Sequence, residues 1–274
     1  MSDKLDRTKG RGLFAVDIAA YDSARPDYPE VLYQAVVDRT GGLGGSEVLE
    51  IGAGNGLASK RLLQLKPSSL TLVEPDTRFR PALESLKSST DIPVNLIFST
   101  FEQASSQSGQ YDHVFAATCF HWLDPETRLQ NMASLLKTDG YAVLMWNVFG
   151  DDSQADPFHD ATQHLFGSVP ISPSNENRQI PFALDVEART EEFRASRLFA
   201  EPEVHKFLWP LELDTEQMLA LYRTFSGVNS LAPEARSELL MGLREVADEQ
   251  FDGTIIRNMT SIVYTAKRTV RAAE

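Results

Sequence analysis

The sequence predicts an α/β protein built on a doubly wound, seven-stranded, mostly parallel sheet. Short, continuous apolar runs alternate with helical patterns, as is typical of strands that are buried on both faces. The first of these runs leads directly into a glycine-rich turn, a common passage from a strand to a helix in such folds. The segments with the composition of strands are 47–51, 70–73, 94–98, 113–117, 141–146, 204–209 and 260–266.

Helices are expected between these strands, because apolar residues recur there at spacings of three and four. The helical segments are 30–39, 57–65, 79–87, 125–136, 215–224 and 233–250. An earlier helical pattern is interrupted at Pro26 and Pro29, and the stretch from 147 to 200 breaks the alternation with prolines and a polar run. We therefore expect a core with a helical N-terminal segment (1–150), an inserted cap (151–200) and a part that completes the sheet (201–274).

The bulk composition narrows the classes of function. Hydrophobic residues make up 42% of the 274 residues, and the formal net charge is −13. An acidic surface repels a phosphate backbone, so we expect a small-molecule substrate and regard nucleic acid as an improbable partner. Cys119 is the one cysteine, which excludes a disulfide within the chain and argues against a cysteine-based zinc site. We expect no metal, no membrane segment, a cytoplasmic location, and a monomer or homodimer.

The glycine-rich turn is the strongest local signal. Gly52, Gly54 and Gly56 follow the strand 47–51 in the spacing G-x-G-x-G. Glycines permit a sharp turn and let a ligand lie against the backbone without a clash with Cβ. The spacing is one residue tighter than the dinucleotide fingerprint, which favours a nucleoside with an amino-acid tail over a pyrophosphate. The alternative is an ordinary glycine-rich turn between a strand and a helix.

Acidic residues follow the next two strands. Glu74 ends the second strand about 20 residues after the glycine turn, where a carboxylate can accept hydrogen bonds from both ribose hydroxyls. The alternative role, an acid at a helix N-terminus, fits Asp76 as well. Phe101 and Glu102 follow the third strand, where they can lie beside an adenine. Alternatively, Glu102 caps a surface turn.

An aromatic segment follows the fourth strand. Phe120 and Trp122 can form an apolar, dry wall around a cation, and His121 between them can orient a substrate or take a proton from it. The alternative is a packed aromatic loop in which the histidine is only hydrogen-bonded. Cys119 has no obvious base beside it in the sequence and is interpreted as a buried filler.

Taken together, these motifs resemble the class I S-adenosylmethionine-dependent methyltransferases, in particular the small-molecule type 11 subgroup with the trans-aconitate methyltransferase-like enzymes. The resemblance covers residues 13–147 well and the rest in outline. It rests on YDSARPDYP (21–29), LEIGAGNG (49–56), VEPD (73–76), FHWLD (120–124) and LMWN (144–147). It implies a Rossmann-like fold, S-adenosyl-L-methionine as cofactor and S-adenosyl-L-homocysteine as product.

The resemblance also implies a role for each matching residue. Contacts to the cofactor are implied for the glycine turn, the strand ends and the N-terminal segment: Tyr21, Arg25, Gly52, Ala53, Gly54, Glu74, Pro75, Phe101, Glu102 and Thr118. Within this set Tyr21 and Arg25 would close over the cofactor, with Arg25 near a carboxylate. Contacts to the acceptor are expected for His121, Trp122 and Trp146. Members of the subgroup often carry a small residue where Phe101 stands, so this chain departs from the pattern at the adenine.

The function predicted is methyl transfer to a small molecule by in-line displacement, in which positioning and exclusion of water supply most of the catalysis. A carboxylate acceptor needs no general base, whereas a hydroxyl or a carbon acid does, and His121 is the candidate. The cap is expected to complete the substrate pocket together with Trp146. The alternatives are an RNA or protein methyltransferase on the same fold, a non-catalytic protein that binds the cofactor, and a nicotinamide-dependent oxidoreductase.

Overall fold

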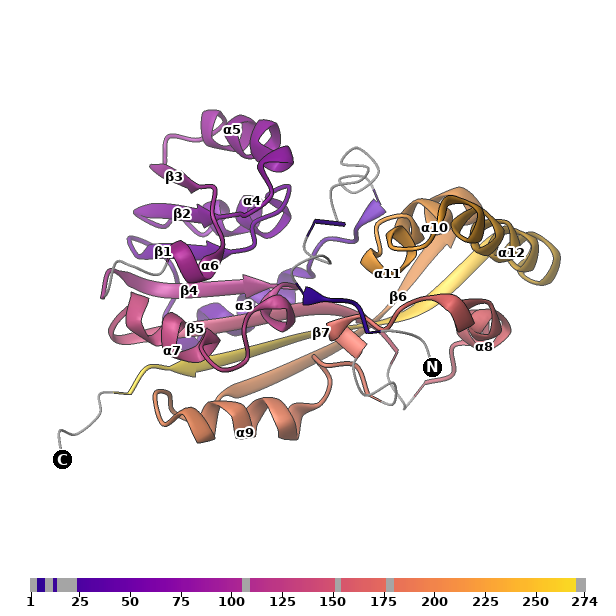
Figure 1. Ribbon diagram of the computed structural model, residues 1–274. Helices are drawn as coiled ribbons and strands as arrows, with labels where there is room; N and C mark the ends of the chain where they lie inside the picture. The colour runs from indigo at the N-terminus through magenta and orange to yellow at the C-terminus, as the bar shows by residue number, and fades with distance from the viewer. Residues whose placement is uncertain are drawn as a thin grey trace. The chain divides into compact units, whose positions relative to one another are not determined.

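The computed structural model describes residues 4–7, 12–13, 24–104, 109–150, 154–175 and 180–269. It confirms the predicted seven-stranded, mostly parallel sheet, with the strand order β3-β2-β1-β4-β5-β7-β6 (Figure 1). The strands are β1 (Glu47–Ile51), β2 (Ser69–Val73), β3 (Val94–Ile97), β4 (Tyr111–Ala117), β5 (Leu136–Phe149), β6 (Glu203–Asp214) and β7 (Thr254–Lys267). The pairings of β1 with β2, β2 with β3, β1 with β4 and β4 with β5 are all parallel.

The direction in which strands are added reverses beside β1. The chain places β2 and then β3 on one side of β1, and β4 and then β5 on the other side. The carboxyl ends of β1 and β4 are therefore neighbours at the reversal. In open α/β sheets ligands bind outside the strand ends at this point.

Residues far apart in the sequence combine into two compact units. The first, called the sheet unit here, contains Asp27–Asn147, Ala183–Phe207 and Ser261–Glu274. The second, called the helical unit, contains Met1–Pro26, Val148–Phe182 and Leu208–Thr260. The strands β5, β6 and β7 are each divided between the two units.

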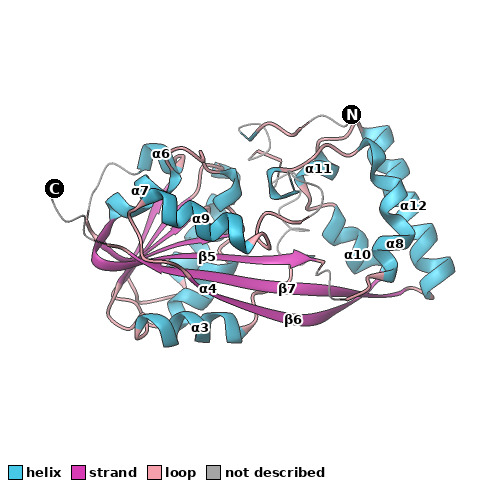
Figure 2. Ribbon diagram, turned by 90° about the horizontal axis from the view of Figure 1, so that it is seen from below, coloured by secondary structure: helices cyan, strands magenta, loops and turns pink. Residues whose placement is uncertain are grey.

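In the sheet unit, helices cover both faces of the sheet (Figure 2). On one face α3 (Glu30–Thr40), α4 (Leu57–Gln64) and α5 (Arg80–Ser88) share an apolar core with buried strand residues such as Leu70, Leu72 and Phe115. The other face carries α6 (Phe101–Ala104), α7 (Arg128–Leu135) and α9 (Val186–Ser196). This two-sided cover explains why every residue of β1 and β2 after the first is buried.

The helical unit has a core of its own. It contains α8 (Pro157–Thr162), α10 (Thr215–Tyr222), α11 (Ser226–Asn229) and α12 (Pro233–Phe251), together with the short 3₁₀ helices η4 (Gln163–Ser168) and η5 (Pro173–Asn175). Phe158, Met218 and Leu243 are fully buried in its apolar cluster. Asp214 starts α10 with a capping box that it forms with Gln217, so the end of β6 is coupled directly to this helix.

The last three strands are longer than the sequence indicates. We expected 141–146, 204–209 and 260–266, whereas β5, β6 and β7 have 14, 12 and 14 residues. Asp139 lies inside β5 and has a φ of 67°, which makes the strand irregular at this residue. Periodicity misses the added residues because many are polar and exposed, as in the alternating pattern of β6.

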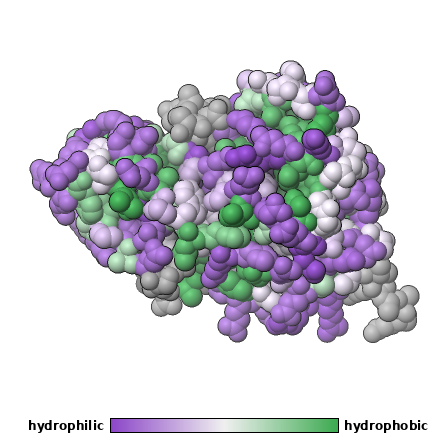
Figure 3. All heavy atoms as spheres, turned by 180° about the vertical axis from the view of Figure 1, so that it is seen from behind, coloured by the Kyte–Doolittle hydropathy of each residue, from purple (hydrophilic) through white to green (hydrophobic). Residues whose placement is uncertain are grey.

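The face in Figure 3 is mostly hydrophilic, with hydrophobic residues gathered in smaller patches. Among the described residues no helix is long and apolar enough to cross a membrane. Likewise, no group of three or more metal-ligating side chains comes together in the described parts of the chain.

Candidate functional site

The glycine turn connects β1 to α4 beside the end of β4. Gly52, Gly54 and Gly56 all have left-handed φ values, between 56° and 84°, which side chains other than glycine rarely adopt. A Cβ on Gly52 would lie 2.8 Å from Cβ of Cys119, so the close approach of the β1 and β4 ends requires glycine there. A Cβ on Gly54 would meet no atom within 4 Å, so the backbone at Gly54 has open space on that side.

Glu74 at the end of β2 holds this turn. Its Oε2 accepts the backbone N–H of Gly54 at 2.8 Å, and its Oε1 accepts the N–H of Asp76 at 2.8 Å. Burial raises the pKa of Glu74 to about 7, while these two hydrogen bonds act in the opposite direction. Each carboxylate oxygen can accept a second hydrogen bond, so the group has the capacity to bind two hydroxyls. The capping role considered for this acid falls to Asp76, whose side chain caps the short helix η2 (Thr77–Phe79).

Glu50 is a chemical group that the sequence reasoning missed. It is 1% exposed in β1, directly before the glycine turn, and Oγ of Ser59 on α4 donates to its Oε2 at 2.5 Å. Burial raises the pKa of Glu50 to about 8, and the negative charge of Glu74 adds to this effect. The sequence does contain a signal for this residue, because Glu50 is an acid between the apolar strand residues Val48, Leu49 and Ile51.

The residues expected at the adenine differ in exposure. Pro75 is exposed, Glu102 is half-buried, and Phe101 is 3% exposed at the start of α6. Phe101 therefore belongs to the packed interior of the sheet unit. Adenine contacts by these three residues stay a prediction.

The end of β4 is fixed by hydrogen bonds in three directions. Thr118 has a φ of 52° and donates its N–H to the carbonyl of Met145 at 2.7 Å. Its Oγ1 lies 2.6 Å from the hydroxyl of Tyr28, a buried residue of the N-terminal motif that was not singled out. Sγ of Cys119 donates to the carbonyl of Ile51 at 2.9 Å, so this thiol ties β4 to β1. Cys119, directly after Thr118, thus lies against the start of the glycine turn, and a contact between Thr118 and the cofactor stays a prediction.

The aromatic segment after β4 forms the short helix η3 (Phe120–Trp122), whose three residues are all buried. Nε1 of Trp146 donates to Nδ1 of His121 at 3.2 Å, so two residues expected to contact the acceptor touch each other. Phe120 and Tyr264 meet the Trp146 ring edge-on, with ring centroids 6.3 and 6.0 Å away. The result is a rigid aromatic cluster beside Thr118.

The N-terminal residues expected to close over the cofactor are only partly described. Tyr21 lies outside the described residues. Arg25 belongs to the helical unit, where its guanidinium donates to the carbonyl of Thr224 at 3.2 Å and lies 4.9 Å from the ring centroid of Phe225. A contact between Arg25 and a cofactor carboxylate stays a prediction.

Comparison with known proteins gives a consistent picture. Residues 49–144 match the family described as a methyltransferase domain. An uncharacterised methyltransferase of Schizosaccharomyces pombe is 25% identical over 233 residues, which cover 85% of this chain and 86% of the relative. The YcgJ protein of Bacillus subtilis shares the fold with a TM-score of 0.56 and 15% identity, covering 88% of this chain and 100% of that one.

A second solved structure holds ligands. Phosphoethanolamine N-methyltransferase 2 of Haemonchus contortus was solved with phosphomonomethylethanolamine and S-adenosylhomocysteine. It has 17% identity and a TM-score of 0.54, and the alignment covers 97% of this chain and 59% of that one. The family match and the shared fold confirm the resemblance to S-adenosylmethionine-dependent methyltransferases, while a likeness to the trans-aconitate methyltransferases stays a prediction.

Proposed function

We propose that this chain, whose residues 49–144 match a methyltransferase domain, uses S-adenosylmethionine to methylate a small molecule by in-line displacement. The observation that carries the proposal is the arrangement of Glu74 and the glycine turn. A buried carboxylate with spare acceptor capacity adjoins an open glycine backbone at the point where the strand order reverses. This combination suits a nucleoside whose ribose hydroxyls donate to the carboxylate.

The proposed cofactor contacts follow from this placement. The ribose hydroxyls donate to Glu74, and the methionine part lies along Gly52, Ala53 and Gly54 with Thr118 beneath it. The adenine lies by Pro75, Phe101 and Glu102. Tyr21 and Arg25 remain in the proposal as residues that close over the bound cofactor.

The acceptor contacts are assigned to His121, Trp122 and Trp146. These residues are buried near the end of β4, where apolar aromatic walls exclude water from the transferring methyl group. A net charge of −13 supports a small acceptor over RNA. Phosphomonomethylethanolamine in the Haemonchus structure is a precedent for a small-molecule ligand on this fold. Residues 151–200 stay in the proposal as the segment that sets acceptor specificity.

Calorimetric titration with S-adenosylhomocysteine tests the proposal. The native protein should bind in the micromolar range, and Glu74→Gln should weaken binding roughly 10- to 100-fold, because it loses hydrogen bonds to a charged acceptor. An analogue without the 2′ and 3′ hydroxyls should lose a similar factor on the native protein and little more on Glu74→Gln.

Glu84→Gln is the control, because Glu84 is an exposed glutamate on α5. It should bind S-adenosylhomocysteine like the native protein. Absence of binding by the native protein would overturn the assignment of the cofactor site. Equal loss of affinity for both ligands in Glu74→Gln would overturn the ribose contact alone.

A further inference from the structure

The hydrogen bond between Trp146 and His121 determines where the proton of this histidine lies. An indole nitrogen carries a hydrogen and can only donate. Nδ1 of His121, at 3.2 Å from Nε1 of Trp146, must therefore be the acceptor and cannot carry a hydrogen itself. In the neutral imidazole the proton is then on Nε2. Protonation of both nitrogens would set two N–H groups against each other and break this hydrogen bond.

The surrounding residues prevent the indole from turning away. Trp146 is 2% exposed, and the edge-on contacts with Phe120 and Tyr264 fix its plane. Tyr264 is itself held, because its hydroxyl donates to the carbonyl of Ala183 at 2.7 Å. Phe120 is covered on its face by the guanidinium of Arg128, 4.2 Å from the ring centroid. The donor therefore stays aimed at His121.

We propose that Trp146 is a positioning residue that fixes His121 in the Nε2–H tautomer, so that His121 acts toward the acceptor as a hydrogen-bond donor and not as a base. The functional part of this inference rests on the proposed function, in which His121 contacts the acceptor. Any hydrogen bond that the neutral ring makes through Nε2 is made as a donor. To accept a proton, His121 would have to exchange tautomers and lose the bond to Trp146.

This role bears on the class of acceptor. In methyl transfer an acceptor lone pair forms the new bond to carbon while the carbon–sulfur bond breaks, and its electron pair stays on the sulfur. A carboxylate oxygen completes this reaction without releasing a proton, and an N–H donor can orient it. A hydroxyl must lose its proton, which His121 in this tautomer has no lone pair to take. The geometry therefore favours an acceptor that is already anionic at oxygen.

Nitrogen NMR of protein labelled with ¹⁵N-histidine tests the tautomer directly. The chain has five histidines, and His121→Gln identifies the signals of this ring by their loss. Nδ1 of His121 should resonate as an unprotonated nitrogen and Nε2 as a protonated one near neutral pH, with and without S-adenosylhomocysteine. A protonated Nδ1, whether in the other tautomer or in the cation, would overturn the inference.

The role of Trp146 is tested by Trp146→Phe, which keeps an aromatic ring and removes the donor. The tautomer ratio of His121 should move roughly five- to tenfold toward the Nδ1–H form, as expected from the loss of one buried hydrogen bond. Trp209→Phe, a change in β6, should leave the ratio unchanged. An unchanged ratio in a Trp146→Phe protein that still binds S-adenosylhomocysteine would overturn the positioning role. Failure of the native protein to bind that ligand would instead contradict the proposed function.

Discussion

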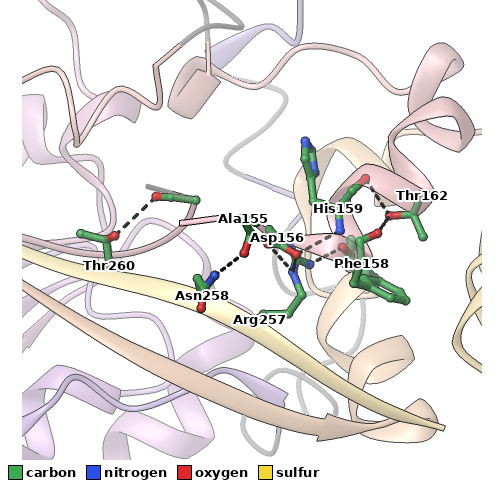
Figure 4. Close-up of polar contacts among 10 residues, drawn as sticks. Ala155, Asp156, Phe158, His159, Thr162, Arg257, Asn258 and Thr260 are labelled. Atoms are coloured by element: carbon green, nitrogen blue, oxygen red, sulfur yellow. Dashed lines mark hydrogen bonds and ion pairs between the residues drawn. The ribbon is translucent and has the colours of Figure 1, made fainter. Parts of the chain in front are cut away.

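The two units bury carboxyl groups in different chemical surroundings. In the helical unit, Asp156 faces Arg257, whose Nε donates to the two carboxylate oxygens at 3.1 and 2.8 Å (Figure 4). A second nitrogen of that guanidinium donates to the hydroxyl of Tyr222 at 2.7 Å. In the sheet unit, Glu50 and Glu74 accept from a serine hydroxyl and from backbone N–H groups, and neither takes part in an ion pair among the described residues.

We propose that this difference distinguishes carboxylates that stabilise the fold from carboxylates of the cofactor site. Burying a carboxylate is unfavourable unless it gains partners, and a guanidinium in direct contact offsets that cost for Asp156. The sheet unit uses the same solution elsewhere, because Arg128 donates to both oxygens of Glu192 at 2.6 and 2.8 Å. At the glycine turn no cation offsets the cost of burial among the described residues, and burial therefore raises the pKa values of Glu50 and Glu74. In the proposed cofactor site, the ribose hydroxyls and cationic groups of S-adenosylmethionine would supply partners for these carboxylates.

Removal of the cation from the paired region should have the largest effect. Arg257→Met leaves Asp156 buried without its counter-charge, so the free energy of unfolding should fall by about 3–5 kcal/mol. Urea unfolding followed by circular dichroism measures this loss. In the double variant Arg257→Met, Asp156→Asn most of the loss should be recovered, because no uncompensated charge remains.

A surface pair in the same unit provides the matched control for Arg257. Arg244 on α12 contacts Glu216 on α10 at 2.5 Å, but both side chains are largely exposed. Arg244→Met should therefore lower the free energy of unfolding by less than about 1 kcal/mol. Losses of equal size in Arg257→Met and Arg244→Met would refute the view that burial makes the inner pair decisive.

Neutralisation of Glu50, a buried acid without a cationic partner among the described residues, should raise the free energy of unfolding. The pKa of Glu50 is about 8 in the folded protein, above its ordinary value of 4.5. The folded state therefore binds more protons than the unfolded state between these values, and the contribution to stability is lost as the pH rises through about 8. Glu50→Gln keeps an acceptor for Ser59 and carries no charge. Its free energy of unfolding should exceed that of the native protein by on the order of 3 kcal/mol near pH 9, and hardly at all near pH 5.

Glu47→Gln is the control for this pH dependence. Glu47 is an exposed residue of the same strand, 2.8 Å from Nζ of Lys137. Its substitution should shift stability by a few tenths of a kcal/mol, with no growth toward alkaline pH. If Glu50→Gln gave no more stability at alkaline than at acid pH, the charge of Glu50 would not be the source of the effect.

The sheet and the glycine turn were predictable because their signals are local. The strands β1, β2 and β4 are short and largely buried, so apolar residues predominate in each of them. Left-handed φ values strongly favour glycine, so the turn at Gly52 and Gly54 can also be predicted from the local sequence. Glu74 follows from its position at the end of β2, 20 residues beyond Gly54.

The remaining parts depend on contacts that the sequence does not encode nearby. Arg257 and Asp156 are 101 positions apart, and Tyr28 and Thr118 are 90 apart. Which residues meet over such separations is decided by the order in which strands pair. The tautomer of His121 could not be predicted for the same reason. The sequence indicated both His121 and Trp146 as site residues, but it did not show that Nε1 of Trp146 donates to Nδ1 of His121.

His113 is a buried group away from the glycine turn. Its contribution to stability should fall as the pH falls, whereas that of Glu50 falls as the pH rises. It lies in β4, is 4% exposed and stacks on Tyr141 with 5.9 Å between ring centroids. Neither ring nitrogen has a hydrogen-bond partner among the described residues. Burial lowers its pKa from 6.5 to about 4, so the folded state binds fewer protons than the unfolded state between these values. This contribution to stability is therefore present above pH 6.5 and is lost as the pH falls toward 4.

His113→Phe retains an aromatic ring for Tyr141 and removes both unsatisfied nitrogens. The free energy of unfolding should rise by about 1 kcal/mol at neutral pH, and by more near pH 5, where the native protein loses stability. Urea unfolding at the two pH values measures the difference. His164→Phe, a change at an exposed position, should leave the acid sensitivity of the native protein intact. If His113→Phe also kept the full acid sensitivity, burial of this imidazole would not be its cause.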